Sequence, residues 1–218
     1  NQVACRAADV IILSVKPQMM ADVARDLAFG IEGQLIISVA AGILLDSLQS
    51  WLGKNTAVVR CMPNTPSLVG QGAAGLFANY NVSMHQKNCA EHILMTVGLV
   101  FWVTQENQLD VVTAVSGSGP AYYFLLMEAM IDAAREFGLD ADIASQLVLQ
   151  TALGAATMAS QSESSPAQLR QAVTSPKGVT EQALRVFEQG HFTALCQQAM
   201  VVARQRSQEL AELYRDIA

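Results

Sequence analysis

The first half of the chain alternates short, continuously apolar runs with segments whose apolar residues recur at helical spacing. Apolar runs of about four to eight residues are typical of strands buried on both faces, and longer periodic segments are typical of helices. The predicted strands are residues 8–15, 34–40, 56–62, 72–79 and 99–104, and the predicted helices between them are residues 17–29, 44–52 and 84–97. This order predicts a doubly wound domain, with a parallel sheet that helices cover on both faces.

The pattern changes at about residue 106 to long helices without strands. The predicted helices are residues 120–137, 140–160, 166–172, 179–189 and 193–217. The second and the last of them are apolar over too much of their circumference for helices on the surface of a monomer. We therefore predict an α/β half followed by an all-α half, and self-association through the helical half.

Composition and charge narrow the range of partners. The chain has 218 residues, of which 51% are apolar and 15% are charged, as is typical of a globular protein. Its net charge of -6 argues against nucleic acid as a partner, because nucleic-acid binding needs a basic surface. No apolar run approaches the roughly 20 residues of a membrane span, so we predict no membrane partner.

The cysteines and the first residues bear on the cellular compartment. The cysteines are scattered without a C-x-x-C pair, which predicts reduced thiols: Cys5, Cys61, Cys89 and Cys196. The first residues do not form a secretory signal, and the chain begins with Asn1 rather than with an initiator Met. We expect the chain to begin inside a longer gene product and to be cytoplasmic.

Two sequence patterns suggest a chemistry that their context does not favour. Residues 70–75 match G-x-G-x-x-G letter for letter, but a loop precedes them and an apolar run follows them. We interpret them as a glycine-rich entry to a strand rather than as a dinucleotide-binding fingerprint. One side of the predicted helix 84–97 carries three possible metal ligands without a recognisable fourth, and we interpret it as an ordinary polar face: His85, Cys89 and His92.

A turn of sequence Ser-Gly-Ser-Gly-Pro, residues 116–120, opens a long predicted helix. Ser118 suits a helix cap and Pro120 suits the first helical turn, whereas the two glycines allow a ligand to approach the backbone closely. Local chemistry leaves both the structural and the binding role open. His191, in contrast, stands alone, and we interpret it as a helix-entry residue.

The most informative stretch is residues 169–184, in which a turn with Pro176 and Gly178 leads into a helix. The free N–H groups and the positive dipole end of a helix N-terminus attract a carboxylate. Ser175 and Thr180 add hydroxyl groups that donate or accept hydrogen bonds. From local chemistry alone, a well-capped turn between two helices is the favoured interpretation.

This stretch resembles the signature of the pyrroline-5-carboxylate reductases, in which Ser-Pro-Gly-Gly-Thr/Ala-Thr precedes a helix. Other segments follow in the same order as in that family, so the resemblance covers nearly the whole chain: residues 8–11 leading to 15–17, residues 38–42, residues 60–66, residues 115–122 and residues 128–134. Several motifs in the right order are far more specific than any one of them.

The resemblance implies an oxidoreductase that reduces 1-pyrroline-5-carboxylate to L-proline with NADPH, or alternatively NADH, in the last step of proline biosynthesis. It implies a partial Rossmann-like parallel-sheet domain over residues 1–105, which binds NADP, and an all-helical dimerisation and substrate-binding domain over residues 106–218. Members of the family form homodimers, which often assemble further into decamers.

The resemblance also implies the site residues. The substrate carboxylate is expected on the N–H groups of Gly178, Val179 and Thr180, supported by Ser175, and the Thr180 hydroxyl is expected to act in catalysis by reaching the ring nitrogen. Two further residues match positions that line the substrate site: Glu106 and Thr113. The residues that match the cofactor side are Val15, Lys16, Pro17, Ala40, Ala41, Gly42 and Asn64.

The chain departs from the family pattern in two places. The family begins with a strand, a glycine-rich phosphate loop and a helix, followed by a second βα unit, and the sequence does not contain them. We therefore expect the chain by itself to bind NAD(P)H poorly. Lys177 and Val179 stand where the family has Gly and a small residue. Lys177 either clashes with a ligand or attracts its carboxylate, and the sequence leaves both open.

Two other classes of protein compete with this interpretation. A 3-hydroxyacid dehydrogenase uses a catalytic lysine on a helix of its second domain, and the lysines of this chain lie outside the long helices of the helical half: Lys16, Lys54, Lys87 and Lys177. A catalytically impaired fragment or relative that retains only self-association is the second alternative. The missing phosphate loop and Lys177 both favour it.

Overall fold

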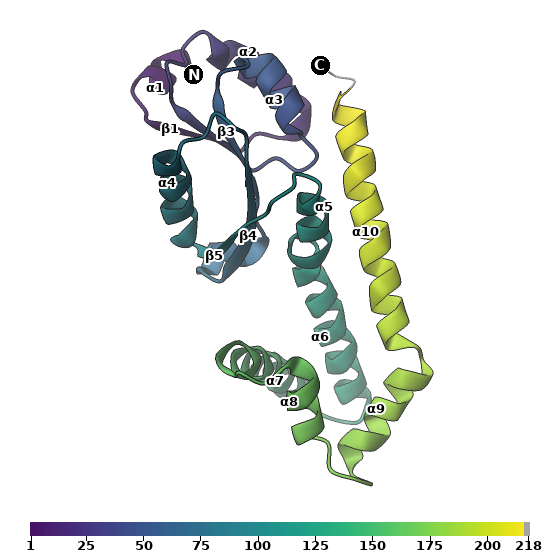
Figure 1. Ribbon diagram of the computed structural model, residues 1–218. Coiled ribbons are helices and arrows are strands. Elements are labelled where there is room, and N and C mark those ends of the chain that lie inside the picture. The colour runs from purple at the N-terminus through teal and green to yellow at the C-terminus, as the bar shows by residue number, and fades with distance from the viewer. Residues whose placement is uncertain (216–218) are drawn as a thin grey trace. The chain divides into compact units, whose positions relative to one another are not determined.

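The computed structural model of the chain describes residues 1–215 (Figure 1). The described part divides into two compact units, which are described separately. The first contains Asn1–Pro120 and the segment that begins at Met200, and the second contains Ala121–Ala199. The units differ from the predicted domains, because residues 106–120 and the end of the last helix pack with the sheet. The domain boundary between residues 105 and 106 stays a prediction.

The first unit is built around a five-stranded sheet. Its strands are β1 (Val10–Leu13), β2 (Leu35–Ser38), β3 (Ala57–Met62), β4 (Gly72–Ala78) and β5 (Gly98–Trp102). They lie in sequence order, and the pairs β1–β2, β2–β3 and β4–β5 are parallel. The alternating α/β order and the mainly parallel sheet confirm the predicted fold class of this half.

The prediction that the whole sheet is parallel is wrong at one pair, because β4 runs antiparallel to β3, with Phe77 opposite Arg60. The connection between the two strands, residues 63–71, contains only the short 3₁₀ helix η1 (Thr65–Val69). A parallel connection needs a crossover of about a dozen residues or more, usually with an α-helix. The short connection therefore turns β4 back beside β3.

Helices cover both faces of the sheet, as predicted. The face that contains Ile36 and Val58 packs against α2 (Pro17–Ala28) and α3 (Leu45–Leu52). The face that contains Ile37 and Val59 packs against α4 (Met84–Met95). Both side chains of each pair are fully buried, because neighbouring residues of a central strand point to opposite, covered faces.

Four short helices of the first unit were not predicted: α1 (Gln2–Arg6), η1 (Thr65–Val69), α5 (Gln108–Val112) and the π-helical turn η2 (Thr113–Gly117). Each spans only about one turn, so its apolar residues do not show a helical period. The predicted helix 193–217 corresponds to α10 (Phe192–Arg215), and residues 216 and 217 lie outside the described residues.

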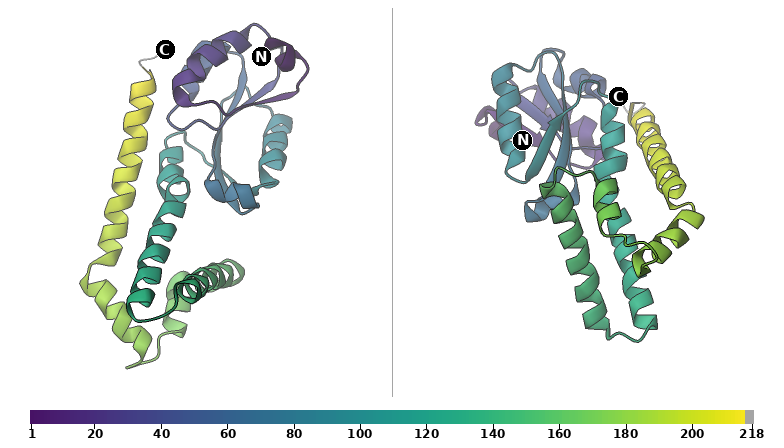
Figure 2. Two further views of the ribbon diagram at one scale, coloured as in Figure 1. Left: turned by 180° about the vertical axis from the view of Figure 1, so that it is seen from behind. Right: turned by 60° about the horizontal axis from the view of Figure 1, so that its bottom comes forward.

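The part of α10 from Met200 onward belongs to the first unit, and both views of Figure 2 show its yellow end near the helices of that unit. Ser207 donates a hydrogen bond to Oδ1 of Asp110 at 2.6 Å, which joins α10 to α5. Leu210 and Tyr214 pack on Gly42, in the loop between β2 and α3. Tyr214 is buried there.

The second unit consists of helices, as predicted: α6 (Gly119–Glu136), α7 (Ala141–Gln161), α8 (Pro166–Ala172), α9 (Val179–Gln189) and the start of α10. Asp140 caps α7 by accepting hydrogen bonds from the N–H groups of Asp142 and Ile143. Ser165 and Gln168 form a reciprocal capping box at the start of α8. Between residues 1 and 215, none of the helices combines the length and the apolar character that crossing a membrane requires.

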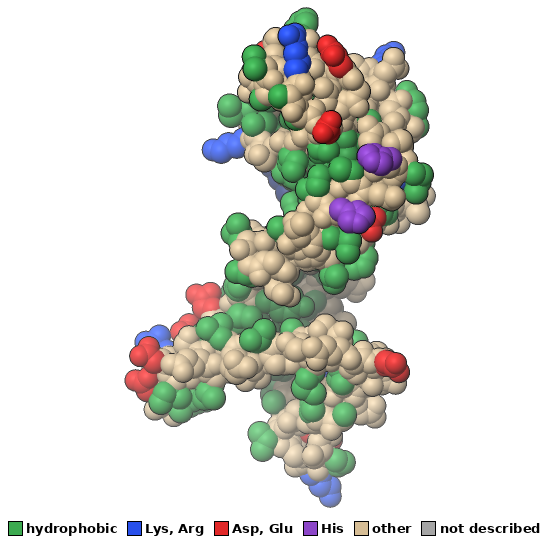
Figure 3. Space-filling model, turned by 90° about the vertical axis from the view of Figure 1, so that its left-hand side faces the viewer, with side chains coloured by type: hydrophobic (Ala, Val, Ile, Leu, Met, Phe, Trp, Pro, Cys, Tyr) green, Lys and Arg blue, Asp and Glu red, His purple; other side chains and the backbone are tan. Residues whose placement is uncertain are grey.

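Large apolar side chains of this unit are exposed, and Figure 3 shows many hydrophobic side chains at the surface. On α7 they recur along the whole helix: Ile143, Leu147, Leu149, Leu153 and Met158 are each half exposed or more. On α6 they include Tyr123, Phe124, Leu125 and Met130. Exposed apolar side chains that recur along a helix are typical of a protein–protein interface.

Candidate functional site

The predicted cofactor-side residues follow the three strands at one end of the sheet. Since β1, β2 and β3 are neighbours and parallel, their carboxyl ends lie at the same edge. Ligands of α/β proteins bind outside this edge. The structure thus brings together the segments that follow these strands, which contain Val15, Lys16, Pro17, Ala40, Ala41, Gly42 and Asn64.

The segment after β1 leads directly into α2. Val15 packs against the core, whereas the side chain of Lys16 is exposed. Lys16 is the N-cap residue of α2 and Pro17 occupies the first turn, where its missing N–H costs nothing. A cationic side chain therefore stands beside the N-terminus of a twelve-residue helix, a combination that favours an anionic group.

The segment after β2 has small side chains. Val39 continues the sheet by donating a hydrogen bond from its N–H to the Leu13 carbonyl at 3.1 Å. Ala40 is buried, and its N–H donates to the Ser38 hydroxyl at 3.4 Å. Gly42 has a φ of 77°, which favours glycine, and its buried position leaves little room for a side chain. Tyr214 and Leu210 fill the space beside Gly42, so Ala41 is the small residue of this segment that stays partly exposed.

Asn64 follows β3 and is the N-cap residue of η1. Its Oδ1 accepts a hydrogen bond from the N–H of Ala73 at 2.8 Å, which ties the end of β3 to the start of β4. The amide NH₂ of Asn64 supplies two further donors. Asn64 therefore stabilises the turn between the antiparallel strands β3 and β4, in addition to any role in binding a ligand.

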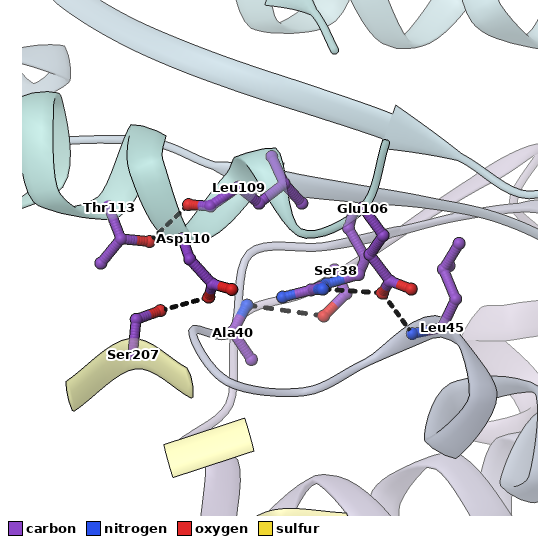
Figure 4. A network of polar contacts seen from close by, with 9 residues as sticks. Ser38, Ala40, Leu45, Glu106, Leu109, Asp110, Thr113 and Ser207 are labelled. Carbon is purple, nitrogen blue, oxygen red and sulfur yellow. Dashed lines mark hydrogen bonds and ion pairs between the residues drawn. The ribbon is translucent and has the colours of Figure 1, made fainter. Parts of the chain in front are cut away.

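Glu106 follows β5 and contacts two other elements of the first unit (Figure 4). Its Oε1 accepts hydrogen bonds from Nη1 of Arg60 and from the N–H of Leu45, each at 2.7 Å. The Arg60 side chain is only 9% exposed and that of Glu106 is 27% exposed. The pair joins β3 to the N-terminus of α3. The prediction that Glu106 lines the substrate site stays a prediction.

Thr113 begins the π-helical turn η2, which the sequence did not predict. Its carbonyl accepts a hydrogen bond from the N–H of Ser118 at 2.8 Å, five residues on, and its hydroxyl donates to the Leu109 carbonyl. Within this turn Gly117 lies against Met62, at the end of β3: a Cβ would come 2.5 Å from Cε of Met62. Single π-helical turns are frequent at functional sites.

The π-helical turn therefore settles the position of the Ser-Gly-Ser-Gly-Pro segment. Its first residues lie beside the carboxyl end of β3, because Gly117 contacts Met62. The missing side chain at Gly117 permits this close approach. The wider turn leaves no periodic signal in the sequence, since it spans only five residues. The glycine pair was the signal that could have indicated it.

The predicted substrate-carboxylate residues lie in the second unit, around the N-terminus of α9. Gly178 is the N-cap residue, and its N–H donates to the Ser175 carbonyl at 3.0 Å. Val179 and Thr180 form the first turn of α9, where helix geometry offers their N–H groups no acceptor. Val179 is 90% exposed. These two N–H groups, rather than that of Gly178, are the donors the turn presents.

Lys177 adopts the left-handed conformation, with a φ of 61°. This conformation costs about 1–2 kcal/mol for a residue with a side chain, and glycine adopts it freely. It gives a physical reason for the glycine that the family has at this position. The N–H of Lys177 donates to Oε2 of Glu181 at 2.9 Å, so the first turn of α9 also carries a carboxylate of its own.

The remaining sequence patterns have structural explanations. The glycine-rich residues 70–75 cap η1 and enter β4, which confirms their interpretation as a strand entry. His191 connects α9 to α10, and its carbonyl accepts from the N–H of Leu195, which confirms a helix entry. Within residues 1–215, no group of three or more His, Cys, Asp or Glu side chains is placed to hold a metal ion. Burial raises the pKa of Cys61 to about 12.

Two protein families match parts of the chain. The family described as pyrroline-5-carboxylate reductase dimerisation matches residues 106–210. The family described as NADP oxidoreductase, coenzyme F420-dependent, matches residues 1–42. The second match contains two of the three strand-end segments described above.

Relatives that are similar over nearly the whole chain are pyrroline-5-carboxylate reductases. The pyrroline-5-carboxylate reductase of Pseudomonas aeruginosa is 55% identical over 213 residues, which are 97% of this chain and 78% of the relative. That of Haemophilus influenzae is 44% identical over 95% of this chain and 77% of the relative. The similarity thus extends over both units.

Solved structures agree with the sequence relatives. The pyrroline-5-carboxylate reductase of Coxiella burnetii superposes with a TM-score of 0.92 at 47% identity, covering 96% of this chain and 78% of the other. The Plasmodium falciparum pyrroline carboxylate reductase, solved with NADP bound, superposes with a TM-score of 0.89 at 31% identity, covering 96% and 80%.

Proposed function

Because the chain belongs to the pyrroline-5-carboxylate reductase family, we propose a division of labour between its two units. The carboxyl edge of β1–β3 binds the dinucleotide, and the first turn of α9 binds the substrate carboxylate. The protein is an oxidoreductase that reduces 1-pyrroline-5-carboxylate to L-proline with NADP as cofactor. An identity of 55% over nearly the whole chain favours this activity over the alternative of an impaired relative.

The residues at the sheet edge fit a dinucleotide. They include the exposed ammonium of Lys16 at the start of α2, the small side chains of Ala40 and Ala41, and the amide of Asn64. A cation and a helix N-terminus suit a phosphate, and small side chains suit a flat ring near the backbone. When bound, the reduced nicotinamide supplies the hydride that reaches the C=N carbon of the substrate.

The N–H groups of Val179 and Thr180 are proposed to hold the substrate carboxylate, together with the Ser175 hydroxyl. Each charge-assisted hydrogen bond of this kind contributes about 1.5–3 kcal/mol. The Gly178 N–H supports the geometry indirectly, because it closes the turn onto the Ser175 carbonyl. The observation that carries this assignment is the first turn of α9, which presents N–H groups and the positive end of the helix dipole.

The Thr180 hydroxyl is proposed to bond to the ring nitrogen of the substrate. Thr180 is the second residue of α9, so it stands beside the N–H groups that hold the carboxylate. A substrate held at two points has a fixed orientation, which is the main contribution a protein makes to a hydride transfer. The nitrogen gains a proton in the reaction, and an imine protonated in solution brings that proton with it.

Dimerisation through the helical residues belongs to the same proposal. The matched dimerisation family and the exposed apolar side chains of α6 and α7 support a homodimer. We propose further assembly into a decamer by the family resemblance alone. We also propose a cytoplasmic location, which the free cysteines of the described residues support.

The direct test is turnover by the purified full-length protein. Oxidation of NADPH, and separately of NADH, is followed with and without 1-pyrroline-5-carboxylate, and proline is identified by chromatography. We expect substrate-dependent oxidation and one proline for each NADPH consumed. A folded, dimeric protein without turnover with either coenzyme would contradict the activity and support the role in self-association alone.

A further inference from the structure

Glu106 connects three elements that are distant in the sequence. Its Oε1 lies 2.7 Å from Nη1 of Arg60, which is 46 residues away, and 2.7 Å from the N–H of Leu45, which is 61 residues away. Figure 4 shows the Glu106 carboxylate beside Leu45, with a dashed line for the hydrogen bond to the Leu45 N–H. One carboxylate oxygen therefore holds a strand and the start of a helix together.

The contact with Leu45 replaces a missing helix cap. Leu45 is the first residue of α3, and the N-cap residue before it, Leu44, has no side-chain acceptor. A carboxylate at this place satisfies one free N–H and interacts favourably with the positive end of the helix dipole. Glu106 thus satisfies the N–H of the first residue of α3, whereas a Ser or Asp at position 44 would accept from the N–H of the second or third residue.

The contact with Arg60 keeps the carboxylate in place. The Arg60 side chain is 91% buried (9% exposed), so its charge needs a partner. Removing one member of a buried ion pair is costly because the other charge stays behind without water. Arg60 therefore determines the orientation of the Glu106 carboxylate. The carboxylate in turn fixes the position of Leu45.

The segment that this arrangement holds is the loop between β2 and α3, residues 39–44. Its first end is held by the sheet, since the N–H of Val39 donates to the Leu13 carbonyl. Its other end is held by Glu106 at Leu45. Between the two ends lie Ala40, Ala41 and Gly42, the proposed cofactor residues.

We propose that Glu106 is a positioning residue for the cofactor, which acts by fixing the end of the loop 39–44, and that it does not act on the substrate. The proposal rests on the proposed binding of the dinucleotide at the carboxyl edge of β1–β3. Arg60 is the second part of the same device, because its guanidinium orients the carboxylate.

The test compares Glu106→Gln and Glu106→Ala in the full-length enzyme. Gln retains an oxygen acceptor for the Leu45 N–H but loses the charge, and Ala loses both. For Glu106→Ala we expect the Kd and KM for NADPH to rise about tenfold, while the kcat at saturation and the KM for 1-pyrroline-5-carboxylate change less than about twofold. The Kd and KM of Glu106→Gln for NADPH should lie between those of the wild type and those of Glu106→Ala.

Glu91→Gln is the matched control, because its carboxylate also accepts a hydrogen bond within the first unit, from Nε1 of Trp102 at 2.9 Å. Its KM for NADPH should not change. If Glu106→Gln and Glu106→Ala raise the KM for the substrate and leave that for NADPH unchanged, the proposal is overturned, because Glu106 then acts on the substrate. Unchanged kinetics in both variants also overturn it.

The variant Ala41→Glu tests the premise, that the dinucleotide binds at the loop 39–44, independently of the role of Glu106. The variant places a bulky anion in the loop itself, so the Kd for NADPH should rise strongly if the dinucleotide binds there. If Ala41→Glu has no effect, the location of the cofactor is wrong and the proposal is overturned with it. If Ala41→Glu weakens binding while Glu106→Ala does not, the cofactor site stands and only the role of Glu106 is refuted.

Discussion

The hydroxyl of Tyr214 accepts a hydrogen bond from Nε2 of Gln18 at 3.0 Å, across 196 residues of sequence. The ring of the same tyrosine packs on Gly42, where a Cβ would lie 3.1 Å from Cδ2. Gln18 lies in the first turn of α2, directly after Lys16 and Pro17. One side chain near the end of α10 therefore contacts Gly42 in the second proposed cofactor segment and the residue that directly follows the first.

Two substitutions measure separately what the hydroxyl and the ring of Tyr214 contribute to stability. Tyr214→Phe should lower the free energy of unfolding by about 0.5–1.5 kcal/mol, because it removes one hydrogen bond. Tyr214→Ala should lower it by about 3–5 kcal/mol, because it leaves a cavity over Gly42. Urea unfolding followed by circular dichroism measures both. Equal effects of the two variants would show that the ring does not pack as described.

The order of the strands and helices could be predicted from the sequence, but the packing of the end of α10 on the loop after β2 could not. The continuous apolar runs that include Ile36, Ile37, Val58 and Val59 predicted the strands because each run is buried on both faces. The contact of Tyr214 with Gly42 joins parts of the chain without a shared local pattern. The direction of β4 was also missed, because an apolar run looks the same in both directions.

The candidate site was predictable only in part for a similar reason. The family motifs located the three strand ends, and the parallel pairing of β1–β3 brings them to one edge. In contrast, the ion pair of Glu106 with Arg60 depends on a loop conformation that charge patterns do not encode. The left-handed backbone at Lys177 was hidden as well, since lysine gives no signal for a positive φ.

The Thr180 hydroxyl is the group whose removal tests the proposed chemistry. Thr180→Ala should lower kcat/KM for 1-pyrroline-5-carboxylate at least about tenfold, because the hydrogen bond to the ring nitrogen is lost. Thr180→Ser retains the hydroxyl and should keep most of the activity. Steady-state kinetics at saturating NADPH decide between them. Wild-type kinetics in the alanine variant would exclude Thr180 from the mechanism.

Lys177→Gly should stabilise the protein by about 0.5–1 kcal/mol. Glycine removes the cost of the left-handed conformation at a φ of 61°, and its larger freedom in the unfolded chain offsets part of the gain. Lys177→Ala is the control, because it removes the ammonium but keeps the strained backbone. Thermal or urea unfolding should therefore rank the glycine variant above both the alanine variant and the wild type.

The same two variants answer the question that the sequence left open about the Lys177 ammonium. If it attracts the substrate carboxylate, both variants raise the KM for 1-pyrroline-5-carboxylate. If it obstructs the carboxylate, both lower it. A change in the glycine variant alone would assign the effect to the backbone instead.

Leu153→Glu should dissociate the dimer. Leu153 is 62% exposed in the middle of α7, and a buried carboxylate without a partner is strongly unfavourable in an interface. Size-exclusion chromatography with light scattering should give the monomer mass. Gln161→Glu, an exposed position at the end of the same helix, should leave the dimer intact. A dimer in both variants would place the interface elsewhere.

The buried thiol of Cys61 makes stability dependent on pH in the alkaline range. Burial raises the pKa of Cys61 from 9.0 to about 12 in the folded protein, so above about pH 9 the unfolded chain loses this proton and the folded protein keeps it. The stability that wild type has over Cys61→Ala should therefore fall as the pH rises, by up to about 1.4 kcal/mol per pH unit.

Urea unfolding of both proteins at about pH 8 and about pH 10.5 measures this difference. The comparison with Cys61→Ala cancels the contributions of lysine and tyrosine, which titrate in the same range. A difference that stays constant between the two pH values would mean that the Cys61 thiol is accessible to water.

The packing of residues 200–215 against the loop after β2 has a consequence for how the protein is made. A ribosome delivers the five strands first, then the whole helical unit, and only afterwards the helix whose Tyr214 and Leu210 rest on Gly42. Until residues 200–215 have been synthesised, the surface around Gly42 stays exposed to solvent, and chaperones have access to it. Translation that stalls before residue 200 of this sequence should therefore yield a product prone to aggregate.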